Sequence, residues 1–182
     1  MSDEDVRRLS IILQDIRPSA LGIALDLTRL EFLDLVSIIP PFVRESLTHL
    51  SLSIILEPDE GEAGVYSVLQ YITILVKLLP IKFIMLSLTW PKFGDNQNQD
   101  TPPQLRYISE NRWEYIQIIQ PLAPALHTMI LDVRILDNWT TDAWKIKRSE
   151  ECIEIEGPIQ NYGALLNDEG MGASDWWDFF ST

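Results

Sequence analysis

The side chains that could carry acid–base or nucleophilic chemistry are sparse: two histidines, His49 and His127, and one cysteine, Cys152. A histidine beside a thiol or a hydroxyl is the usual pairing of a general base with its nucleophile. His49 and His127 precede different predicted strands with two elements between them, so we expect the two rings to lie apart. A lone cysteine is far more often a small core residue than a nucleophile. The sequence therefore predicts no enzymatic activity and no catalytic residue.

Metal-ligating and phosphate-binding patterns are also missing. Two histidines and one cysteine this dispersed do not supply a zinc ligand set. The acidic segment 57–62 (EPDEGE) could attract calcium, but it lacks the alternating acidic spacing and closing glutamate of a calcium loop. We interpret it as a solvated loop. No glycine-rich phosphate loop occurs. We therefore predict no metal site and no cofactor.

Composition narrows the class of protein further. The chain has 182 residues, 46% of them hydrophobic and 23% charged, which is typical of one globular domain. A formal net charge of −13 disfavours nucleic acid, because phosphate binding needs a clustered basic surface. No apolar run is long enough to span a membrane, and the acidic start Met1–Asp5 is unlike a secretory signal. A single cysteine excludes an intramolecular disulfide. We expect an intracellular protein, cytoplasmic or nuclear.

The elements that must position any site follow from a recurring spacing of apolar residues. Leucine-type residues are separated by two residues and then by one, which is typical of leucine-rich-repeat strands. The four occurrences are Leu30/Leu33/Leu35, Leu47/Leu50/Leu52, Phe83/Leu86/Leu88 and Leu126/Met129/Leu131. Helical periodicity predicts helices over 64–79 and 105–120. We predict an α/β fold over residues 1–156, an irregular leucine-rich-repeat-like solenoid of stacked parallel strands with helices on its outer face.

The last part of the chain, residues 157–182, is predicted to be an acidic, aromatic tail or cap. No lysine or arginine follows Arg148, and residues 151–156 alternate as an edge strand would. Residues 157–174 are predicted to be a loop. The aromatic pairs Trp176-Trp177 and Phe179-Phe180 have two interpretations: they cover the open end of the solenoid, or they dock into another protein.

In strands of this pattern the leucine-type positions point inward and the intervening positions form the concave face. This face mixes small polar groups with a few apolar anchors, which suits a protein or peptide partner. A solvated face without a ligand is the alternative. The candidate partner-binding residues are His49, Ser51, Ser53, Met85, Ser87, Thr89, Thr128, Ile130, Asp132 and Arg134.

The segment 42–52 (FVRESLTHLSL) resembles the leucine-rich-repeat regions of fungal F-box proteins, in which proline, phenylalanine and a few polar residues precede a Leu-Thr-x-Leu-x-Leu strand. The helix ending Leu78-Leu79-Pro80 is also similar, and the resemblance covers roughly residues 30–136. It implies a substrate receptor of a ubiquitin ligase. The F-box itself is missing from the sequence, which argues against a Skp1-type adaptor as partner. Two hypotheses follow: a non-catalytic protein-interaction module, or a truncated structural fragment with no independent activity.

Overall fold

The computed structural model describes residues 11–13, 19–26, 39, 41–56, 61–90, 101–150 and 152–169. In chain order the elements are β1 (Ala20–Asp26), α3 (Pro41–Ser46), β2 (His49–Ile55), α4 (Gly61–Leu78), β3 (Phe83–Trp90), α5 (Pro103–Glu110), α6 (Arg112–Ile119), the 3-10 helix η3 (Gln120–Leu122), β4 (Thr128–Ile135), β5 (Asn138–Arg148), β6 (Ile153–Glu156) and α7 (Tyr162–Asp168). The strand expected around residues 30–35 and the aromatic segment 176–180 lie outside the described residues.

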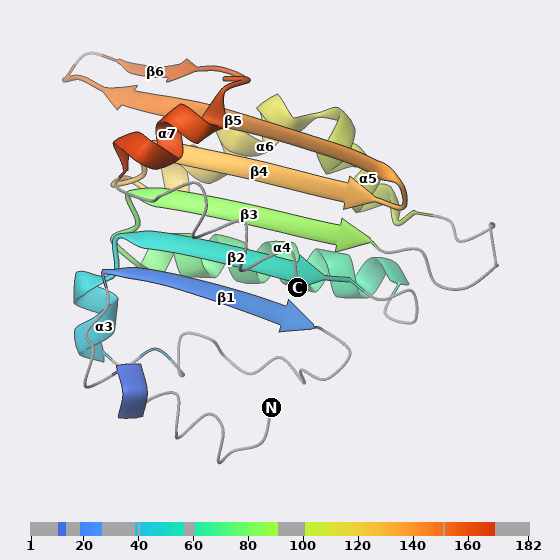
Figure 1. Cartoon of the computed structure of the whole chain (residues 1–182), viewed down its shortest axis with the longest axis horizontal. Helices are drawn as coiled ribbons and strands as arrows, with labels where there is room; N and C mark the ends of the chain where they lie inside the picture. The colour runs from blue at the N-terminus through green and yellow to red at the C-terminus, as the bar shows by residue number, and fades with distance from the viewer. Residues whose placement is uncertain are drawn as a thin grey trace.

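The strands form one six-stranded sheet in which spatial order follows chain order, β1 to β6 (Figure 1). Strands β1 to β4 are parallel, whereas β4, β5 and β6 pair antiparallel. The sheet curls into a half-barrel. The predicted leucine-rich-repeat solenoid is therefore wrong. The chain is a mixed α/β protein, because a solenoid needs every strand to run in the same direction and β5 here runs opposite to its neighbours β4 and β6.

The reversal of direction happens at a two-residue turn, Leu136 and Asp137, between β4 and β5. Leu136 adopts a positive φ of 55°, and its backbone N–H donates to the carbonyl of Trp90 over 2.9 Å. A turn this short leaves no room for a crossover helix, so the chain must pair antiparallel with the strand it has just left. Strand β5 had no counterpart among the predicted elements.

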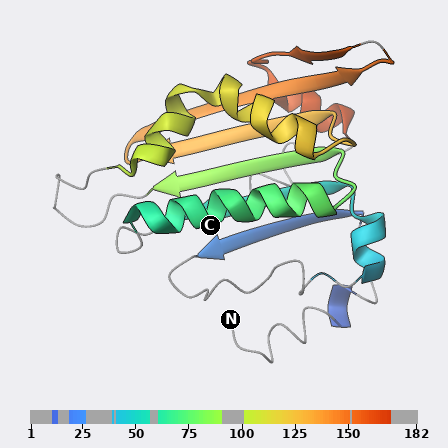
Figure 2. The same cartoon turned by 180° about the vertical axis from the view of Figure 1, so that it is seen from behind.

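The leucine-type positions do form the expected buried face. Leu52, Leu86 and Leu131 lie opposite one another on β2, β3 and β4, and all three are buried. The prediction that Leu52 and Leu86 belong to the core is confirmed. Helices α4, α5 and α6 cover this face of the sheet (Figure 2), because each crossover between parallel strands returns on the same side.

The helix predicted over 105–120 is interrupted at Asn111. This residue has φ −122° and ψ 42°, so α5 ends and α6 begins around it, and η3 follows. The interruption rotates the second helix relative to the first. Trp113 is therefore 42% exposed, while Tyr115 is buried.

The opposite face of the sheet carries helix α7, within the region predicted to be a loop (Figure 1). Its Leu165 and Leu166 are buried in a second apolar cluster with Phe83, Met85 and Ile130 of the sheet. Strand β6, by contrast, occupies the sheet edge that the alternation of residues 151–156 predicts.

Candidate functional site

The ten residues predicted to bind a partner share one face of the sheet, as the strand register shows. Ser51, Met85 and Ile130 lie in one row across β2, β3 and β4, and Ser53, Ser87 and Asp132 lie in the next. Six of the ten are nevertheless buried: Ser51, Met85, Ser87, Thr128, Ile130 and Asp132. The others, His49, Ser53, Thr89 and Arg134, are half-buried. The expectation of an open concave surface is therefore wrong, while the partner-binding role of these residues stays a prediction.

Part of this face is buried because α7 lies on it. Met85 and Ile130, which were expected to be exposed apolar anchors, instead contact the buried cluster that includes Leu165 and Leu166. Burial of such side chains stabilises the fold by about 1.5–3 kcal/mol each. This face of the sheet thus packs against α7 of the same chain.

Asp132 lies on this face and is fully buried, with its carboxylate saturated by donors. Ser87 Oγ donates to Oδ2 over 2.9 Å and Thr141 Oγ1 donates to Oδ1 over 3.0 Å. The Arg134 guanidinium lies 3.1 Å from Oδ2, and the Trp139 indole N–H donates to Oδ1. The Arg134 guanidinium also stacks 4.4 Å from the centre of the Trp139 ring. A carboxylate paired in this way holds β3, β4 and β5 together; buried charge is tolerated only with such partners.

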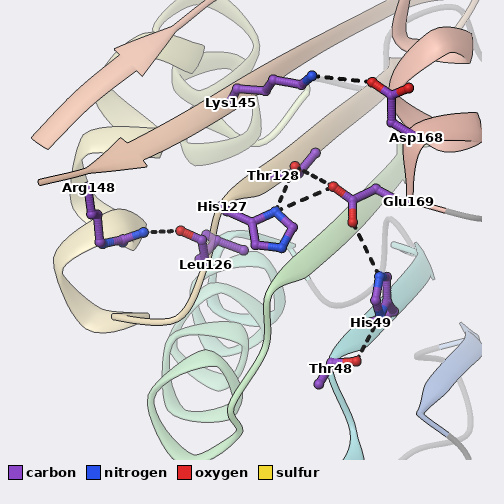
Figure 3. A network of polar contacts seen from close by, with 9 residues as sticks. All are labelled: Thr48, His49, Leu126, His127, Thr128, Lys145, Arg148, Asp168 and Glu169. Atoms are coloured by element: carbon purple, nitrogen blue, oxygen red, sulfur yellow. Dashed lines mark hydrogen bonds and ion pairs between the residues drawn. The ribbon is translucent and has the colours of Figure 1, made fainter.

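A second polar cluster joins the two histidines through Glu169, the residue after α7 (Figure 3). Glu169 Oε2 lies 3.4 Å from Nε2 of His49, and Oε1 lies 3.4 Å from Nδ1 of His127. The Thr128 hydroxyl donates to Oε1 over 2.9 Å. His49 and His127 therefore share one carboxylate, and the expectation that they lie apart is wrong. Strand β3 lies between β2 and β4, and Glu169 spans it.

This cluster attaches the end of α7 to the sheet. The Glu169 carboxylate accepts hydrogen bonds from residues at the start of β2 and at the start of β4, which fixes the end of α7 over the sheet. Desolvation by burial lowers the pKa of His127, although the Glu169 charge acts in the opposite direction.

Cys152 is exposed, and its Sγ lies 3.4 Å from Ser149 Oγ in the turn between β5 and β6. Among the described residues, no group of three or more His, Cys, Asp or Glu could hold a metal ion.

A concave site with apolar walls lies on the other side of the molecule, in the helical layer. A groove of about 870 Å³ runs between α4 and the pair α5–α6. Its walls include Leu69, Ile74, Tyr107, Ile108, Tyr115 and Ile118. Ile74 is 49% exposed, Tyr107 47% and Ile118 53%. Exposed aliphatic side chains gathered along a groove are typical of a binding surface.

Two residues that line this groove each carry a buried polar atom with no partner among the described residues. The Tyr115 hydroxyl is buried and makes no hydrogen bond, and the side-chain oxygen Oε1 of Gln104 is buried without a donor. Burial raises the pKa of Tyr115, so its hydroxyl stays protonated at neutral pH. Buried polar groups in native proteins are usually paired, so each orphan group calls for an explanation.

The sequence signal for this groove was present but weak. Ile74 and Ile118 fall outside the inward-facing positions of their helices, where polar residues are the rule. Isolated exposed aliphatics are common, however, so neither residue indicates a site until the break at Asn111 brings α6 alongside the other walls.

No protein-family model, curated protein or solved structure matches this chain. In the described part of the chain, no helix is both long and apolar enough to cross a membrane.

Proposed function

We propose that this chain is a non-catalytic protein-interaction module that binds an apolar segment of a partner protein in the groove between α4 and α5–α6. The supporting observation is the groove itself, an apolar depression of about 870 Å³ with half-exposed aliphatic side chains along its walls. Leaving such surface in water costs free energy, which a partner's apolar side chains recover on binding.

The contacts of the chemistry-bearing residues agree with a binding role. His49 and His127 are engaged in attaching Glu169 and hence α7. Asp132 is engaged in joining three strands. A ubiquitin-ligase substrate receptor, the role that the sequence resemblance implies, is one kind of interaction module. That role stays a prediction.

Site-specific photo-crosslinking tests the proposal. A benzophenone amino acid replaces Ile118 in the groove or, as a control, Ile153 on the edge strand β6. The two positions are matched in exposure, at 53% and 52%. In extracts of the native cells, we expect a discrete crosslinked species at position 118 and none of that mass at position 153.

Competition then decides whether the crosslink reports specific binding. Excess unlabelled chain should suppress it, whereas an Ile74→Glu chain should not, because a carboxylate at the groove wall opposes apolar binding. Equal crosslinking at both positions, or no competition by the unlabelled chain, would contradict the proposal and favour the alternative of a structural fragment without activity.

A further inference from the structure

We propose that helix α7 is an acid-released cover of the sheet face, held closed at neutral pH by the Glu169 carboxylate that His49 and His127 share. Glu169 Oε2 lies 3.4 Å from Nε2 of His49, and Oε1 lies 3.4 Å from Nδ1 of His127. Figure 3 shows the carboxylate between the two rings. One carboxylate can balance one positive imidazolium but not two, so the cluster that holds α7 is sensitive to acid. The groove lies on the opposite side of the sheet, so this switch is independent of partner binding there.

The attachment of α7 depends on its contacts with the sheet. The helix has seven residues, and a helix this short is not stable in water without tertiary contacts. Leu165 and Leu166 supply the apolar contacts, in a buried cluster that includes Met85 and Ile130 of the sheet. Glu169 supplies the polar contacts at the end of the helix. Weakening the carboxylate cluster therefore favours local detachment of α7, while the sheet keeps its own core on the other face.

The surroundings of His127 oppose its protonation while α7 is in place. The ring is partly buried, and this burial lowers its pKa. The Glu169 charge acts in the opposite direction, but the other charged groups around the ring are cationic and add to the effect of burial. The groups that face His127 from the neighbouring segments are Glu169, His49 when protonated, Lys82 and Arg148. Asp168, the other acid at the end of α7, pairs with Lys145 over 3.4 Å.

Acid therefore favours the state in which α7 has left the sheet. In that state His127 returns to water, and its pKa returns to the ordinary value of about 6.5. The open state takes up the proton first as the pH falls. Each pH unit below about 6.5 then shifts the equilibrium toward the open state by up to about tenfold, until the closed state binds the proton as well. Above this range neither state binds the proton and the cover stays closed. Opening exposes Phe83, Met85 and Ile130 of the sheet face.

Hydrogen–deuterium exchange of the full chain between pH 7.5 and pH 5.5 tests the proposal, with rates corrected for the intrinsic pH dependence of amide exchange. We expect the opening of residues 162–169 to increase by up to about tenfold from pH 6.5 to pH 5.5. It should stay more frequent than the opening of β2 and β3, whose Leu52 and Leu86 belong to the core. Exchange that does not depend on pH would overturn the proposal. A common opening of α7 and both strands would also do so, because it would report global unfolding.

Two variants identify the group that takes up the proton. His127→Asn combined with His49→Gln places an amide nitrogen close to each ring nitrogen that faces Glu169, but neither amide titrates. This double variant should keep α7 equally closed at pH 7.5 and pH 5.5. Glu169→Gln removes the carboxylate and keeps an acceptor oxygen, so α7 should still open on acidification if the histidines are the switch. An unchanged acid response in the double variant, or a response lost in Glu169→Gln, overturns the proposal. Circular dichroism checks that the variants fold.

Discussion

The carboxylate of Glu169 lies 3.4 Å from Nε2 of His49, although 120 positions separate the two residues in the chain. The same carboxylate accepts the Thr128 hydroxyl bond over 2.9 Å. Glu169 is thus the polar end of the attachment that Leu165 and Leu166 make through apolar contact. The C-terminal end of α7 is thus held on the sheet both by polar contacts and by apolar contacts.

Replacing Glu169 with Ala should destabilise the protein by about 1–3 kcal/mol, because the buried hydroxyl of Thr128 loses its acceptor. Urea denaturation followed by circular dichroism measures the change. The neighbouring Asp168 is the control, since its side chain is 67% exposed and pairs with the exposed Lys145. Asp168→Ala should change stability by less than about 0.5 kcal/mol. Equal losses at both positions would contradict the anchoring role of Glu169.

Stability should fall as pH falls below about 6.5, the unperturbed value for histidine, partly because of His127. Burial lowers the pKa of this histidine in the folded state, so the unfolded chain takes up the proton first as the pH decreases. Above that range neither state binds the proton and the contribution vanishes. Melting temperatures between pH 7.5 and pH 5.5 measure the trend. His127→Gln should reduce the slope, and an unchanged slope would show that His127 does not contribute.

Removing the buried carboxylate of Asp132 should cost about 3 kcal/mol or more, because four donors lose their acceptor and Arg134 loses its ionic partner. Denaturant titration of Asp132→Ala measures the loss. Asp142→Ala on the neighbouring strand is the matched comparison: its side chain is 24% exposed and pairs with Arg112 over 2.5 Å. We expect at most about 1 kcal/mol there. A smaller loss at Asp132 than at Asp142 would refute the structural role of the network.

Gly157→Ala should destabilise the fold by about 1–3 kcal/mol. An added Cβ would lie 2.5 Å from Cδ1 of Trp144 and 2.7 Å from the carbonyl oxygen of Ala143, at a φ of 150° that disfavours side chains. Gly163→Ala in α7 provides the opposite case, because its Cβ would meet nothing closer than 3.6 Å. Helix propensity favours Ala there by about 0.5–1 kcal/mol. Thermal melts of the two variants should therefore shift in opposite directions, and a shared direction would argue against the close approach at Gly157.

The local alternation of apolar and polar residues was sufficient to predict which side chains of β2 and β3 form the leucine-lined core face. In β2 and β3 the leucine-type residues occupy every second position, and side chains of a strand point alternately to its two faces. Leu52 and Leu86 are therefore identifiable as core residues from their neighbours alone. The edge strand β6 is predictable for the same reason. Both predictions depend only on residues close in sequence and on the two-residue period at which side chains of a strand alternate between its faces.

The direction of the chain after β4 was decided by tertiary structure. Hairpins of two residues are usually marked by Gly or Asn at positive φ, and Leu136 occupies that position instead. Without a turn signal, the sequence predicted neither strand β5 nor a reversal of the chain after β4. Likewise, the break at Asn111 reorients α6 and creates the groove, although the helical periodicity runs through it.

The sites themselves were decided by contacts between distant segments. His49 and His127 share Glu169 only because parallel strands align their starting ends and α7 returns across them. Met85 and Ile130 of the sheet face were predicted to be exposed because no local pattern shows that a short helix folds over that face. The sequence by itself thus determined which residues of β2, β3 and β4 form the leucine-lined core face. Only the assembled structure decided which segment covers them, since that choice depends on chain reversal and on surfaces that no single segment contains.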